Sequence, residues 1–208
     1  MLHSAEARWF FRGTIPTAVD DWFLGGHRIE PESRIDRYLV FPGCDSVGVK
    51  LRDTDGSRGG ELEIKALIGA PQVTRLTRDV TARTDAWVKW TCPTQAFLEG
   101  PGSMRSAGSS WVTVTKLRSL RKFALDGDGF VEVGADQPPD EGCDAELTAL
   151  DVNRTPWWTF GFEASGPREA VRSHLLTVAS RWLEREPPCD LGVIQSASYP
   201  TWVAGFVA

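Results

Sequence analysis

The stretch Ala5-Glu6-Ala7-Arg8-Trp9-Phe10-Phe11-Arg12 alternates between two kinds of side chain. Side chains along a β-strand point to opposite faces in turn, so both faces of such a strand can be read from its sequence. One face carries Glu6, Arg8, Phe10 and Arg12, and the other carries Ala5, Ala7, Trp9 and Phe11. The stretch therefore predicts a strand with one largely charged face and one apolar face.

The same division recurs in four more stretches, at 47–52, 61–66, 144–149 and 157–164. In most of them charges of one or both signs share one face and apolar residues occupy the other. Such a pattern is also typical of a solvated antiparallel sheet, in which Glu and Lys pair across strands. Its recurrence on so many strands favours a second interpretation, in which the charged faces line a largely basic groove or tunnel that also holds carboxylates.

The composition sets limits on the class of protein. With 208 residues, 41% of them hydrophobic, and nine Trp, the chain fits one large domain with a substantial core. We expect this domain to span 1–208, with tunnel strands at about 5–165 and a C-terminal helix and tail at 166–208. The net charge of −5 argues against general nucleic-acid binding.

The cysteines and the apolar runs indicate a cytoplasmic protein. Four widely spaced cysteines form no Cys-x-x-Cys pair and are predicted to be free thiols: Cys44, Cys92, Cys143 and Cys189. No secretion signal is recognisable, and no apolar run reaches the roughly 20 residues that span a bilayer. We therefore expect no membrane partner. The oligomeric state is not determined by these features.

The periodicity and the turn residues predict a β-rich α+β fold. Strands are expected at about 5–12, 34–41, 46–52, 61–66, 87–90, 111–118, 123–125, 130–133, 145–151 and 157–164. A short helix at 18–24 ends at two glycines, and Ser165 is predicted to cap a second helix that ends before Pro187. The stretch 93–108, rich in Gly, Pro, Ser and Ala, is predicted to be a loop, and a gating role at one end of the tunnel stays open.

The charged faces supply the candidate site residues. The predicted phosphate-binding cations are Arg8, Lys50, Arg52, Lys65, Lys89, Lys116 and Arg118, and Arg12, Arg121 and Lys122 are possible additions. The carboxylates are Glu6, Glu61, Glu63, Glu146 and Glu163, with Asp36 and Asp144 as further candidates. Arg and Lys bind phosphate oxygens, and carboxylates suit Mg²⁺ or Mn²⁺. A Walker-type phosphate loop is absent from the sequence.

The order of these stretches resembles the CYTH superfamily, the triphosphate tunnel metalloenzymes. Glu6-Ala7-Arg8-Trp9-Phe10 stands where the family has Glu-x-Glu-x-Lys. The other matching stretches are Asp36-Arg37-Tyr38-Leu39, Val49-Lys50-Leu51-Arg52, Leu62-Glu63-Ile64-Lys65, Lys116-Leu117-Arg118, Ala145-Glu146-Leu147 and Phe162-Glu163. The resemblance implies an antiparallel eight-stranded closed barrel, or tunnel, with peripheral helices, and metal-dependent action on triphosphates.

The leading hypothesis is a divalent-metal-dependent hydrolase acting on a triphosphate-containing substrate. Glu63, Glu146 and Glu163 are the predicted catalytic residues, and Glu6, Glu146 and Glu163 are the predicted ligands of Mg²⁺ or Mn²⁺. The chain departs from the family at Arg8, which replaces a metal carboxylate, and at Phe10, which replaces the Lys. A binding protein for phosphate, a nucleotide or another anionic metabolite, without turnover, is therefore a second hypothesis. A structural or partner-binding barrel is the third.

Overall fold

A computed structural model describes residues 1–41, 43–52, 60–93, 110–127, 129–134, 139 and 141–207. Ten strands account for most of it: β1 (Leu2–Arg12), β2 (Glu32–Val40), β3 (Val47–Arg52), β4 (Glu61–Leu67), β5 (Gln72–Arg75), β6 (Thr81–Pro93), β7 (Ser110–Asp126), β8 (Gly129–Val133), β9 (Gly142–Val152) and β10 (Thr155–Gly166). The α-helices are α1 (Thr17–Leu24), α3 (Val171–Trp182) and α4 (Tyr199–Ala204), and a 3₁₀ turn, Leu183–Arg185, follows α3.

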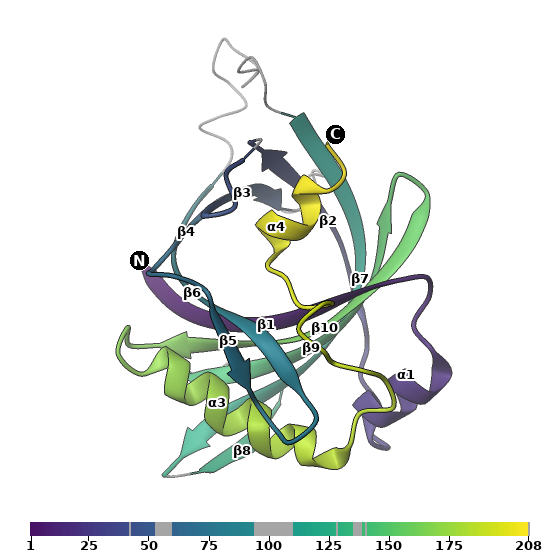
Figure 1. Cartoon of the computed structure of the whole chain (residues 1–208), viewed down its shortest axis with the longest axis vertical. Coiled ribbons are helices and arrows are strands. Elements are labelled where there is room, and N and C mark those ends of the chain that lie inside the picture. Colours follow the sequence, from purple (N-terminus) through teal and green to yellow (C-terminus); the bar gives the residue numbers. More distant parts are fainter. Residues whose placement is uncertain are drawn as a thin grey trace.

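Eight of the strands form a closed antiparallel barrel, in the order β1-β10-β9-β7-β2-β3-β4-β6, and β6 pairs with β1 to complete the ring (Figure 1). The two remaining strands lie off the ring, β5 on β6 and β8 on β7. Closure leaves the ring without an unpaired edge. The eight-stranded barrel predicted from the sequence is therefore confirmed.

Helices cover the apolar outer face of the barrel. Outward side chains of β1, β9 and β10 form one buried cluster with α1 and α3, as the charged-inside pattern predicts. Trp182 of α3 lies at its centre, stacked on Phe160 with ring centroids 5.5 Å apart and edge-on to Phe162 at 5.7 Å. Figure 1 shows α3 along the outside of the barrel and α1 at the end of β1. These helices therefore pack on the outer face of β1, β9 and β10, whose inner face carries site residues.

The interior of the barrel is divided into a charged part and an apolar part. Phe10, Tyr38 and Val114 belong to a second buried cluster, which also includes Tyr199 and Val203 of α4. The C-terminal helix thus packs against inward-facing side chains rather than on the outer surface. The structure thus places the aromatic end of the C-terminal tail in one end of the barrel.

One local prediction is wrong, and two predicted strands are shorter than the observed ones. Ser165 does not cap a helix, because β10 continues through Gly166 and α3 begins only at Val171. Ser165 is held in the sheet, where it lies opposite Ser4 on one side and Gly142 on the other. The expected strand at 87–90 is part of the 13-residue β6, and 123–125 is the end of the 17-residue β7. Short β5 was not predicted.

Other expectations concern the cysteines, the loop and membranes. The four cysteines are free, and Cys143 is buried. The predicted loop at 93–108 lies, beyond Pro93, outside the described residues. Within the described part of the chain, none of the helices has the length and apolar character needed to cross a membrane.

Candidate functional site

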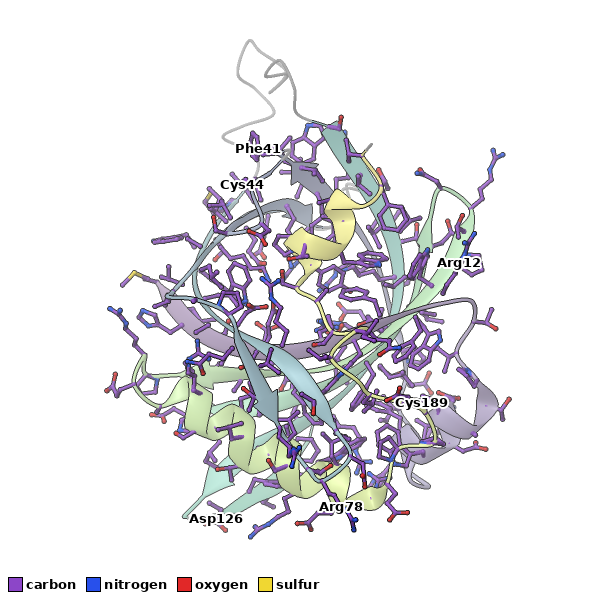
Figure 2. The ribbon with its side chains drawn as sticks, in the orientation of Figure 1. Arg12, Phe41, Cys44, Arg78, Asp126 and Cys189 are labelled. Carbon is purple, nitrogen blue, oxygen red and sulfur yellow. The ribbon has the colours of Figure 1, made fainter. Side chains whose placement is uncertain are left out.

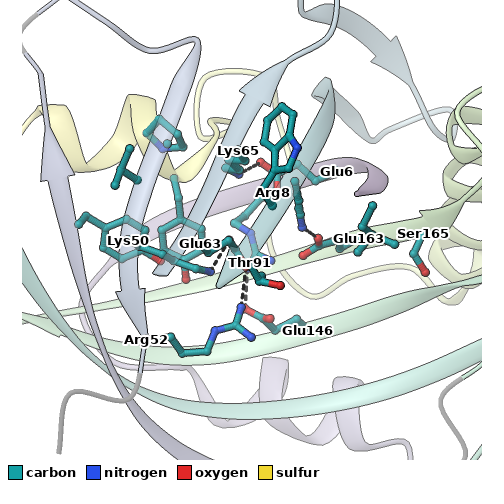
Figure 3. Close-up of a pocket in the computed structure, with 18 of the residues that line it drawn as sticks. Glu6, Arg8, Lys50, Arg52, Glu63, Lys65, Thr91, Glu146, Glu163 and Ser165 are labelled. Atoms are coloured by element: carbon teal, nitrogen blue, oxygen red, sulfur yellow. Dashed lines mark hydrogen bonds and ion pairs between the residues drawn. The ribbon is translucent and has the colours of Figure 1, made fainter. Parts of the chain in front are cut away.

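The charged part of the barrel encloses a cavity of about 460 Å³. All eleven residues predicted for the site line it: Glu6, Arg8, Lys50, Arg52, Glu63, Lys65, Lys89, Lys116, Arg118, Glu146 and Glu163. They come from β1, β3, β4, β6, β7, β9 and β10, and Figure 3 shows many of them converging on one space. The charged faces are therefore turned inward and are not the solvated surface of a sheet. The roles assigned to these residues stay predictions.

Arg8 and Glu146 form a buried ion pair across β1 and β9. Their atoms Nη1 and Oε1 are 2.8 Å apart, and the Arg8 side chain is only 2% exposed. Arg118 approaches the other carboxylate oxygen at 3.6 Å, and Thr148 donates a hydrogen bond to Glu146. Burial favours the neutral acid, but the neighbouring cations outweigh it and hold the pKa of Glu146 well below its usual range. Glu146 is thus a charged acceptor already bound by protein cations.

Glu63 lies between two cations on β3. Lys50 Nζ and Arg52 Nη2 approach its two oxygens at 2.9 and 2.8 Å. Lys50 is directly opposite Glu63 in the β3–β4 ladder, so the strand register creates the pair. Burial opposes ionisation, yet Lys50, Lys89 and Arg52 keep the pKa of Glu63 far below its ordinary value. The sequence predicted the shared face but not this pairing.

Lys116 is a fully enclosed cation of the site. Its ammonium group contacts Asp36 at 2.9 Å and donates a hydrogen bond to the Tyr38 hydroxyl at 2.7 Å. Arg34 approaches the other oxygen of Asp36 at 3.2 Å. Burial lowers the pKa of Lys116 to about 7 although Asp36 favours the charged form, so this cation is able to titrate near neutral pH.

Sequence reasoning assigned no site role to several other residues that line the cavity, among them Arg34, Tyr38, Tyr199 and Pro200. For Arg34 and Tyr38 a signal was present, because both share a strand face with Asp36. Tyr199 and Pro200 come from the aromatic tail, more than 30 residues beyond the last strand. No alternation links them to the tunnel, so only the folded chain shows their place.

Two of the possible additional cations lie elsewhere. Arg12 is exposed at the end of β1 (Figure 2). Arg121 points to the outside of the barrel, where it binds both oxygens of Glu132 and the carbonyl oxygen of Phe23. Its neighbour in the outer cluster is Trp182, whose ring lies 5.9 Å from the guanidinium. Arg121 is therefore part of the packing between β7 and α1 rather than of the site.

The predicted metal ligands do not form a ready metal site. Glu6 binds Lys65 at 2.8 Å, Glu146 binds Arg8, and Glu163 binds Lys89. Nor do the described residues contain any group of three or more His, Cys, Asp or Glu side chains that could hold an ion. A divalent cation placed here would have to compete with ammonium and guanidinium groups for each carboxylate. Dependence on Mg²⁺ or Mn²⁺ thus stays a prediction.

The comparisons with known proteins concern the fold. No protein-family model matches the chain, and no curated protein matches it. The PH1819 protein from Pyrococcus horikoshii OT3 has a TM-score of 0.51 at 9% identity, over 97% of this chain and 99% of that one. HpAC1 from Hippeastrum, for which a dominant triphosphatase activity is described, has a TM-score of 0.45 at 9% identity, covering 99% and 96%.

A triphosphatase of the Mimivirus capping enzyme has a TM-score of 0.45 at 11% identity, covering 85% of this chain and 87% of that one. Identities this low say nothing about a shared activity. The likeness to the PH1819 protein, which concerns the fold alone, agrees with the closed ring of eight strands. The chemistry performed in the tunnel has to be argued from its own residues.

Proposed function

We propose that the tunnel binds the phosphate chain of a triphosphate-containing substrate and that the protein hydrolyses it. The observation that carries the proposal is the convergence of eight cations from β1, β2, β3, β4, β6 and β7 on one cavity: Arg8, Arg34, Lys50, Arg52, Lys65, Lys89, Lys116 and Arg118. A triphosphate carries several negative charges, and one guanidinium group donates hydrogen bonds to two phosphate oxygens at once. Cations on all sides of the phosphate chain would replace the interactions with water that the anion loses when it enters the tunnel.

The cavity has a size suited to such a ligand. Its volume of about 460 Å³ falls within the range of small-molecule sites, which runs from about 300 to 1,000 Å³. The cations neutralise charge on the phosphate oxygens, which is the main contribution that proteins make to phosphoryl transfer. Glu63, Glu146 and Glu163 are the proposed catalytic carboxylates, and their part would be to position the attacking water.

A second function, anion binding without turnover, is favoured by one specific observation. Each proposed catalytic carboxylate is held by a protein cation: Glu63 by Lys50 and Arg52, Glu146 by Arg8, and Glu163 by Lys89. A carboxylate bound in this way is a weak base and a poor metal ligand. The same tunnel would then store or sense an anion instead of hydrolysing it.

A thermal-shift titration followed by a phosphate-release assay separates the two functions. Inorganic triphosphate and ATP are added with Mg²⁺, with Mn²⁺ or with EDTA, because a ligand that binds only the folded state raises the melting temperature. Stabilisation with phosphate release that EDTA abolishes supports the metal-dependent hydrolase. Release that survives EDTA, or that survives Glu146→Gln combined with Glu163→Gln, contradicts the metal-dependent mechanism. Stabilisation without release identifies a binding protein, and no shift at all contradicts both functions.

A further inference from the structure

The C-terminal segment enters the barrel by pairing with β1. The strand β6 pairs with β1 only as far as Ala7. Beyond that point the tail takes its place: Phe10 N donates to Gln195 O at 2.9 Å, and Ala197 N donates to Arg8 O at 3.1 Å. The Ser196 hydroxyl joins the two strands by donating to Arg8 O and accepting from Arg83 N. These bonds set the position at which α4 begins.

Aromatic side chains of α4 then fill one end of the barrel. Trp202 stacks on Phe10 with ring centroids 4.5 Å apart and planes 10° apart. Tyr199 stacks on Tyr38 at 5.4 Å and meets Phe10 edge-on at 5.1 Å. Figure 1 shows α4 within the ring of strands, beside β2 and β3. Phe10, which stands where the family resemblance implies a Lys, is thus a packing partner of α4.

Close contact with β3 completes this end. A Cβ atom added to Gly48 would lie 3.0 Å from Pro200 Cγ and 3.0 Å from Lys65 Cγ. Contacts this short are not tolerated without movement, so the glycine leaves the space that α4 occupies. Phe10, Tyr38 and Val114, on β1, β2 and β7, form a buried apolar cluster with Tyr199 and Val203 of α4 at this end.

The buried cations lie next to this closed end. The Lys116 ammonium is 3.9 Å from the centroid of the Tyr199 ring, and the Arg8 guanidinium carbon is 5.0 Å from it. Both cations are 2% exposed. The cavity is also lined by Met1 and Leu2, which are 84% and 49% exposed and mark its other end as the one that reaches solvent.

The Tyr199 hydroxyl is an unused donor at the same place. Tyr199 is 7% exposed and lines the cavity, yet its hydroxyl has no hydrogen-bond partner among the described residues. Leaving a buried hydroxyl unpaired costs free energy, and burial also raises its pKa, so it stays protonated and able to donate. A phosphate oxygen that reaches the closed end would supply the missing acceptor.

From these observations we infer that α4 makes the tunnel a one-ended site, which selects ligands with a free terminal phosphate and binds that phosphate beside Arg8, Lys116 and the Tyr199 hydroxyl. The inference rests on the proposed function, because it presumes that the tunnel binds a phosphate chain. It adds the direction of entry and the substrate class. A chain with organic groups at both ends cannot place a phosphate at the closed end, since its second group would meet Tyr199 and Trp202.

Calorimetric titration with three probes tests this inference: inorganic triphosphate, ATP and diadenosine tetraphosphate. The last has a nucleoside at both ends and carries about as many charges as ATP, so it controls for charge alone. We expect the first two to bind and the third to bind about tenfold more weakly or worse. Affinities for ATP and diadenosine tetraphosphate within about threefold of one another would overturn the one-ended site. If none of the probes binds, the proposed function itself fails.

Tyr199→Phe tests the hydroxyl separately, because it keeps the ring and its stacking. We expect the affinity for inorganic triphosphate to fall by about three- to tenfold while the melting temperature of the free protein does not fall. An unchanged affinity would remove Tyr199 from the phosphate site. A lower melting temperature would show that the hydroxyl is used within the free protein, which also contradicts its assignment as an unused donor.

Discussion

At the scale of single residues, the tunnel is organised by the cost of burying charge. Glu6, Glu63 and Glu146 are all less than 9% exposed, and each contacts a cation from another strand. A buried charge without a partner is strongly destabilising, whereas a pair with good geometry offsets most of that cost. Alternation in the sequence predicts which residues share a face, but the partner of each carboxylate follows from strand order and register.

The pair of Arg8 and Glu146 gives a measurable prediction. Arg8→Met keeps much of the side-chain volume and leaves Glu146 with Arg118, at 3.6 Å, as its nearest cation. We expect the free energy of unfolding to fall by about 3 kcal/mol at pH 7, because a buried carboxylate loses its main partner. Urea denaturation followed by circular dichroism measures the change.

The double variant Arg8→Met with Glu146→Met is the matched control. Since it removes both charges, its loss of stability should be smaller than the sum of the two single losses by at least about 1 kcal/mol. Losses that add within error would show that the two side chains are not coupled, in contradiction to the 2.8 Å contact.

At the scale of elements, strand pairing overrides local signals. Ser165 and Pro167 resemble the start of a helix, yet the backbone of Ser165 pairs on both sides with neighbouring strands, so β10 continues to Gly166. The same holds for β6, of which only 87–90 was predicted. Pairing with β1, β4 and β5 keeps all 13 of its residues in one strand, and a local pattern does not show those pairings. The position of α4 likewise depends on its pairing and packing with distant strands.

A substitution at Gly48 tests the close packing of α4 against β3. We expect Gly48→Ala to lower the free energy of unfolding by about 1–3 kcal/mol, because the new methyl group overlaps Pro200 and the Lys65 stem. Gly129→Ala is the control: there the nearest atom to the added Cβ is the flexible end of Arg181, at 3.1 Å, which is free to turn away. Denaturant unfolding of both variants measures these losses. Equal losses of stability in Gly48→Ala and Gly129→Ala would contradict a close fit between β3 and α4.

At the scale of the whole molecule, closing the sheet into a ring concentrates positive charge. The chain has a net charge of −5, but the cavity gathers eight of its 23 Lys and Arg residues. Burial lowers the pKa of Lys89 to about 8 and that of Lys116 to about 7. The lining sets these eight cations against five carboxylates, so its formal charge is positive although that of the chain is negative, and it falls as the two lysines lose protons.

This titration predicts a pH dependence of ligand binding. Each lysine is charged below its pKa and neutral above it, so the affinity for inorganic triphosphate should fall as pH rises from 6 to 9. An arginine stays charged over this range, and we expect a smaller fall in Lys89→Arg than in the unaltered protein. Calorimetric titration at pH 6, 7.5 and 9 measures both. The protonation of inorganic triphosphate itself affects both proteins equally, so it cancels when Lys89→Arg is compared with the unaltered protein. Identical pH profiles of the two proteins would contradict the prediction.

A large part of the fold and of the site was predictable. The alternation in β1, β3, β4, β9 and β10 pointed to a tunnel. The eleven residues given a catalytic, phosphate-binding or metal-binding role all line the cavity, whereas the further candidates Arg12, Glu61 and Arg121 do not. Arg34 and Tyr38 share a strand face with Asp36, so their place was within reach of the same reasoning. Tyr199 and Gly48 were not, because their roles depend on a contact between the C-terminal segment and β3.

The two-residue period of charged and apolar side chains was enough to place the candidate site residues on one face of their strands, because a strand has only two faces. The family resemblance added the closed barrel, which turns that face inward. The period carries no information about which strands become neighbours or what fills the ends of the ring. Those features follow from long-range packing: Arg8 meets Glu146 across 138 positions of sequence, and Tyr199 reaches the cavity only after the tail pairs with β1. The blind end of the tunnel is therefore a property of the folded chain, since it arises from side chains that become neighbours only when the barrel closes.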